Sequence, residues 1–181
     1  MSVWTRIGAL LDRLGGVLVA VSAVLLLAMV VLMGIEIGAR GLLRTSTQIA
    51  DEYAGYLFTW ITLCCFVYAQ RSDRFLRVDT LRNRLSPRRR AFADAIASLL
   101  AAALTAVLVY ATGETFRASL LFNTTSLQPS QTPLYLPQIV MPVGLAVLTF
   151  AFVHSAVTSL LQALGRLPLP AAAAPQQASY E

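Results

Sequence analysis

Long apolar runs separated by short polar segments dominate the sequence. The clearest run carries no charge from Leu14 to Ile35, and about 20 apolar residues let an α-helix cross a hydrocarbon core of roughly 30 Å. Two further runs are bounded by charged residues, and a fourth follows a polar, turn-rich stretch at 123–132. We therefore predict an all-α integral membrane protein with four transmembrane helices, at about residues 14–35, 53–70, 95–113 and 137–164.

The first and fourth runs carry additional signals. The first is longer than the apolar core of a secretory signal, and no small-residue cleavage pattern follows it, so we expect it to be retained. In the fourth run, Pro137 fits a first helical turn, where its missing N–H would be unpaired anyway. Pro142 lies further inside and is expected to bend the helix.

The segments flanking the runs are amphipathic or polar. Residues 1–13 place apolar side chains, including Trp4, on one helical face, which predicts a helix lying on the cytoplasmic membrane surface. A second interfacial helix is expected between Arg40 and Glu52. The segment 166–181 has no periodicity and is rich in Pro, Ala, Gln and Ser, so it is expected to be a disordered cytoplasmic tail. The membrane domain is then 14–165.

Arginine placement predicts the orientation. All basic residues are arginine, and the stretch 71–90 holds eight of the fourteen. Short loops rich in positive charge stay cytoplasmic. With four crossings both termini are then cytoplasmic, and residues 36–52 and 114–136 face outward.

Composition supports a membrane location. The chain is 57% hydrophobic and 13% charged, whereas soluble proteins carry roughly 25% charged residues. The net charge of +5 does not indicate nucleic-acid binding, because the basic residues lie in loops without an aromatic-rich patch.

Residues for catalysis or cofactor binding are scarce. His154 is the single histidine, which excludes a bis-histidine haem site, and we interpret it as a hydrogen-bonded residue facing the bundle. Cys64 and Cys65 are adjacent within one run and read as small buried side chains. No metal-ligand spacing, phosphate loop or nucleophile motif appears, so we expect no enzyme, cofactor or metal. Three charged pairs at helical spacing are expected to be local ion pairs: Glu36–Arg40, Asp73–Arg77 and Glu114–Arg117.

Small and aromatic residues indicate close helix packing. Gly34 and Gly38 form a small-xxx-small pair. Trp60 lies too deep for an interfacial residue and is expected to pack against protein. A small stripe along the third span is expected at Ala93, Ala97, Ala101 and Thr105.

Several segments carry a family resemblance in order and spacing. They are Arg40 and the acidic pair Asp51–Glu52 before Tyr53, Tyr56 and Trp60; Ala69–Arg71; the Leu-Arg-Val-Asp-Thr-Leu run at 76–81; and Ser126–Leu127, Pro133–Tyr135 and Pro142–Gly144. Together they resemble the small membrane subunit, DctQ-type, of tripartite ATP-independent periplasmic (TRAP) transporters. One departure is Phe75, where many members carry a histidine.

The resemblance implies a scaffold in a bacterial inner membrane. A large multi-span subunit would carry the substrate and sodium sites, and a periplasmic binding protein would deliver small organic acids or related solutes. The residues implied to be structural or at the subunit interface are Arg40, Asp51, Glu52, Tyr56, Trp60, Arg77, Val78, Asp79, Pro133, Pro142 and Gly144. Four outward residues are candidates for contact with the binding protein: Arg44, Gln48, Asn123 and Gln128.

Two other functions stay open at this point. The chain could be an autonomous small transporter or channel, although it lacks intramembrane acids and shows only one proline interruption. It could also assemble or anchor an unrelated membrane complex.

Overall fold

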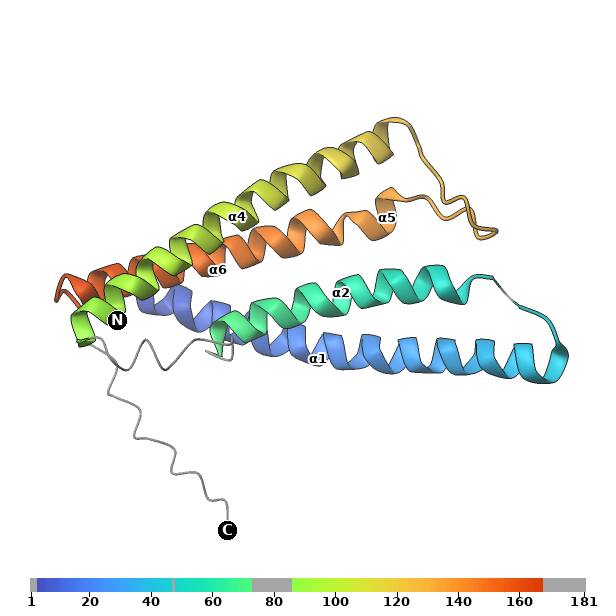
Figure 1. Cartoon of the computed structure of the whole chain (residues 1–181), viewed down its shortest axis with the longest axis horizontal. Coiled ribbons are helices and arrows are strands. Elements are labelled where there is room, and N and C mark those ends of the chain that lie inside the picture. The colour runs from blue at the N-terminus through green and yellow to red at the C-terminus, as the bar shows by residue number, and fades with distance from the viewer. Residues whose placement is uncertain (1–2, 47, 73–85, 168–181) are drawn as a thin grey trace, which may run out of the picture.

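A computed structural model describes residues 3–46, 48–72 and 86–167, and the described chain is helical (Figure 1). The elements are α1 (Val3–Gly38), the π-helical turn η1 (Ala39–Leu43), α2 (Ala50–Arg71), α4 (Pro87–Leu121), α5 (Tyr135–Gln138) and α6 (Val140–Ala163). In this part of the chain the single β-bridge joins Thr125 and Pro133. The predicted all-α class is confirmed.

The helices lie in a row, in the order α1, α2, α6, α4 (Figure 1). Each of the contacts α1–α2, α2–α6 and α6–α4 joins neighbours in this row. We call the end holding Asp12, Arg71 and Arg166 the terminal end, and the end holding Arg40 and Asp51 the loop end. Both hairpins turn at the loop end.

Helix α1 differs from its sequence prediction. A surface helix over residues 1–13 followed by a separate span was expected, but one unbroken helix runs from Val3 to Gly38. At Gly15 this helix lies close to α2, because a Cβ added there would lie 3.5 Å from the Cα of Tyr68. The second expected interfacial helix, between Arg40 and Glu52, is also absent from the described residues, where η1 and a turn precede Ala50.

Helix α4 buries a stripe of small residues that differs from the expected one. Ala93 and Ala97 of the predicted stripe are exposed. The buried residues instead recur at the three- and four-residue steps of a heptad, which keeps one seam facing a neighbouring helix. They are Ala91, Ala95, Ser98, Ala102, Thr105 and Ser119. A constant step of four residues does not follow this seam around the helix. Thr105 is therefore the one residue of the expected stripe that is buried.

The fourth apolar run is divided into two helices near Pro142, the residue expected to bend it. Pro142 has no N–H to donate to the carbonyl of Gln138, and α5 ends at that residue before α6 begins at Val140. Two residues beyond the proline, Gly144 lets α6 approach α2. A Cβ added there would lie 3.2 Å from the Cβ of Leu63.

Three described helical stretches are long and apolar enough to cross a membrane: 6–42, 87–121 and 135–163. Helix α2 is not among them, since tyrosine, threonine and glutamine residues interrupt its apolar run. Only 6% of the most apolar stretch of α1 is buried inside the molecule, against 22% for α4 and 17% for α6. The row of helices therefore leaves extensive apolar surface uncovered.

Candidate functional site

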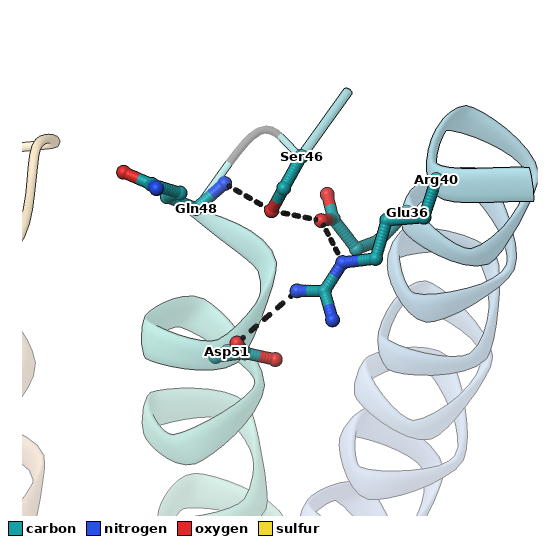
Figure 2. Close-up of polar contacts among 5 residues, drawn as sticks. All are labelled: Glu36, Arg40, Ser46, Gln48 and Asp51. Atoms are coloured by element: carbon teal, nitrogen blue, oxygen red, sulfur yellow. Dashed lines mark hydrogen bonds and ion pairs between the residues drawn. The ribbon is translucent and has the colours of Figure 1, made fainter. Parts of the chain in front are cut away.

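Arg40 joins the first two helices at the loop end (Figure 2). Its Nε donates to Oε1 of Glu36 at 2.7 Å, and its Nη2 lies 3.3 Å from Oδ2 of Asp51. Ser46 donates its hydroxyl to the same Glu36 oxygen at 2.7 Å and accepts the backbone N–H of Gln48. The Glu36 side chain is only 3% exposed. Arg40 and Asp51, which the resemblance implies to be structural or at the subunit interface, thus meet across the turn.

Glu52 joins α2 to the segment between α4 and α5. Its carboxylate accepts the hydroxyls of Tyr56, one turn further along, and of Ser130. Neighbouring Tyr53 shares a hydrogen bond of 3.1 Å with the hydroxyl of Thr132. Two helical hairpins are therefore connected by side chains at the loop end.

Residues 122–134 form a folded finger rather than an open loop. The backbone N–H of Ser126 donates to the carbonyl of Thr132, and that of Leu134 donates to the carbonyl of Thr124. Pro133, a predicted structural residue, lies in this paired base opposite Thr125. Leu127 at the tip is fully exposed.

The acid–base state of Glu52 follows from this arrangement. Desolvation raises the pKa of its carboxyl, but the hydroxyl hydrogen bonds from Ser130, Tyr56 and Ser126 outweigh that effect and leave the pKa below its ordinary value. Glu52 is consequently an ionised acceptor at neutral pH.

Trp60 packs against protein, as its depth predicted. Its indole Nε1 donates to the carbonyl of Pro137 in α5 at 3.1 Å. One turn nearer the terminal end, Leu63 meets Gly144 of α6. The predicted residues Trp60 and Gly144 therefore both lie along the seam between α2 and the α5–α6 segment.

An open hollow of about 600 Å³ lies at the loop end, lined by Arg40, Ser46, Gln48, Asp51 and Gln128. It brings together Gln48 and Gln128, two of the four candidates for binding-protein contact. The other two, Arg44 and Asn123, are exposed but do not line it. Arg44, Gln48 and Asn123 all have a left-handed backbone, with φ of 52°, 56° and 46°, which is uncommon outside glycine.

Three further predicted residues, Arg77, Val78 and Asp79, lie outside the described residues, as does the predicted Asp73–Arg77 pair. The other two predicted ion pairs are confirmed. Glu36–Arg40 is described above, and Arg117 lies 3.0 Å from Glu114.

Sequence reasoning missed a polar cluster at the terminal end. Arg71 lies 2.7 Å from Asp12 of α1, and its Nη1 lies 3.3 Å from Nδ1 of the buried His154 in α6. Its Nη2 also donates to the carbonyl of Gly8. The sequence places Arg71 in the arginine-rich stretch and in the resemblance segment Ala69–Arg71, but gives it no partner in α1 or α6. The available signal was that Asp12 and Arg71 lie at the borders of the first two apolar runs, while the single histidine lies within the fourth run.

The fold and these clusters define a class: a small helical protein with apolar outer faces and its polar side chains concentrated at the two ends. A model of the DctQ component of tripartite ATP-independent periplasmic transporters matches residues 29–162. Because that range covers well over half of the 181 residues, the chain belongs to this family and is a DctQ-type small subunit of a TRAP transporter. No curated protein and no solved structure matches the chain.

Proposed function

We propose that this chain is a non-catalytic scaffold of a sodium-coupled TRAP transporter. It would hold a large multi-span transport subunit in the bacterial inner membrane and help a periplasmic binding protein dock. The substrate and sodium sites would lie on the large subunit, and small organic acids or related solutes would be imported. Membership of a transporter-component family supports this assignment.

The observation that carries the proposal is the uncovered apolar surface of the helix row. Large exposed apolar residues occur along both edge helices, for example Val24 and Leu27 on α1 and Leu104 and Val107 on α4. Lipid alone could cover these apolar faces. A row that is one helix thick, however, has two broad sides. One side is thus free to bind a second membrane subunit while the other meets lipid.

We further propose that α2 crosses the membrane as a fourth span, with both termini cytoplasmic. The predicted span at 53–70 lies within this helix, whose 22 residues correspond to about 33 Å at 1.5 Å per residue, against a core of roughly 30 Å. Its packing on α1, which runs antiparallel to it, and on α6, which runs parallel to it, supplies protein contacts for its polar side chains. A periplasm-active reporter fused after residue 84 should be inactive, and activity there would contradict this orientation.

At the loop end, the hollow and the finger form the surface proposed for the binding protein. This surface combines charged Arg40 and Asp51 with the amides of Gln48 and Gln128 and the apolar tip Leu127. A mixture of polar groups and an exposed apolar side chain is typical of transient protein interfaces.

Co-purification tests the scaffold function. A tagged chain expressed from its own genomic context should retain a large multi-span protein. Leu27→Trp and Leu104→Trp form a matched pair, because added bulk is tolerated against fluid lipid but disrupts a packed protein interface. At equal expression, we expect the variant whose tryptophan lies in the protein interface to retain less of the partner, and the variant whose tryptophan faces lipid to retain a normal amount. A chain that never retains such a partner would contradict the proposal.

A further inference from the structure

Four arginines gather at the terminal end, where α4 begins and α6 ends. Arg88, Arg89 and Arg90 lie in the first turn of α4, which contains no acidic residue. Arg166 follows α6, and the neighbouring Gly165 lies beside this turn, because a Cβ added there would be 3.6 Å from Nη2 of Arg88. The two segments therefore present one basic surface.

These arginines are available to a ligand within the described part of the chain. Arg88, Arg89 and Arg166 are exposed and Arg90 is half-buried. The ion pairs described between residues 3–46, 48–72 and 86–167 use the acids Asp12, Glu36, Asp51 and Glu114, and none of these pairs includes an arginine of the cluster. The cluster thus concentrates positive charge that an external anion would offset.

An apolar stripe continues directly from the arginines. Arg89, Phe92, Ile96 and Leu99 recur at steps of three and four residues, so they lie on one face of α4. The three apolar side chains are 54%, 45% and 62% exposed. From Arg89 to Leu99 the helix rises about 15 Å, which is half of a hydrocarbon core of roughly 30 Å. One face therefore offers positive charge at its end and apolar surface to the depth of one leaflet.

We propose that this surface binds an anionic phospholipid. The phosphate lies among Arg88, Arg89 and Arg166, and an acyl chain lies along Phe92, Ile96 and Leu99. Guanidinium groups match phosphate oxygens with paired hydrogen bonds, and basic clusters next to a membrane span attract anionic lipids. A free anion would use only the arginines, and a nucleic acid would leave the stripe uncovered. The proposal requires the chain to be in a bilayer but does not depend on its scaffold role.

Lipid binding to the delipidated full chain tests the proposal. Native mass spectrometry in detergent would compare phosphatidylglycerol with phosphatidylcholine of the same acyl chains. We expect the native chain to prefer phosphatidylglycerol. The double variant R88Q/R166Q should weaken that binding by about 25-fold, at roughly fivefold for each arginine lost near the headgroup.

Two further variants serve as controls. R6Q/R13Q removes two exposed arginines from α1 near the same end and should change binding by less than about twofold, since neither residue belongs to the cluster. R88K/R166K keeps the positive charge and should retain most of the preference for phosphatidylglycerol. This variant therefore distinguishes an effect of lost charge from an effect of misfolding. Equal binding of both lipids, equal losses in the two glutamine variants, or full displacement of the lipid by inorganic phosphate would each overturn the proposal.

Discussion

Glu36 shows how a single buried carboxylate fixes the turn between α1 and α2. It accepts from Arg40 and from Ser46, and Arg40 extends the connection to Asp51 at the start of α2. A buried carboxylate needs such donors because burial removes its hydration. The exposed Arg117–Glu114 pair has the same chemistry but remains hydrated, so its energetic value is small.

We predict that Arg40→Gln destabilises the chain and that Arg117→Gln does not. Loss of Arg40 removes a charged donor from buried Glu36 and should clearly lower the free energy of unfolding. Loss of Arg117 should cost at most about 0.5 kcal/mol. Unfolding in mixed micelles of increasing SDS content measures both free energies. An equal loss of unfolding free energy in the two variants would contradict the importance assigned to the burial of Glu36.

The Glu52 carboxylate should make the finger contact sensitive to acid. Its pKa in the folded chain lies below the ordinary 4.5, so its contribution to stability is present above that pH and is lost as the pH falls through the lower folded value. The thermal midpoint of the native chain should therefore exceed that of Glu52→Gln at neutral pH. The difference should shrink by about pH 3. A difference that stays constant over this range would contradict the ionised state of Glu52.

Residue pairs close in sequence were easier to predict than those joined only by packing. The pairs Glu36–Arg40 and Glu114–Arg117 follow from helical spacing alone. The contact between Arg71 and His154 spans 83 positions, and it forms only because α2 and α6 are neighbours at that depth. Spacing along the chain contains no information about which helices are neighbours.

At the scale of elements, the helices were predictable and their packed faces were not. The apolar runs located α1, α2, α4 and α6, but charge at the ends of a run does not stop a helix, so α4 extends beyond the predicted 95–113 at both ends. Alanine is abundant in α4, so several small stripes fit its sequence. The neighbouring helix determines which of these stripes is buried, and the sequence alone does not identify that neighbour.

Gly144 provides the sharpest test of helix packing. An added methyl group would meet Leu63 at 3.2 Å, closer than ordinary van der Waals contact. Gly144→Ala should therefore destabilise the chain by about 1–3 kcal/mol through overpacking. Gly113→Ala is the matched control, because its added Cβ has no neighbour within 4 Å and alanine favours the helix. The thermal midpoints in detergent compare them, and a neutral Gly144→Ala would contradict the close α2–α6 contact.

At the scale of the molecule, two hairpins are joined along one seam between α2 and α5–α6. Contacts occur at the loop end, in the middle and at the terminal end: Glu52–Ser130 and Tyr53–Thr132, Trp60–Pro137 and Leu63–Gly144, and Arg71–His154. Such a seam connects the two hairpins along their length within the row of helices (Figure 1). Sequence alone predicted the helices of this row but not their order in it, because apolar surface around each helix is compatible with several arrangements.

The row of described helices suits the proposed role of a subunit that supports another protein. Solute uptake into liposomes tests this account most directly. Liposomes containing only this chain should show no uptake above protein-free liposomes, whereas adding the large subunit and the binding protein should give uptake driven by a sodium gradient. Saturable solute flux through the chain alone would contradict the scaffold role.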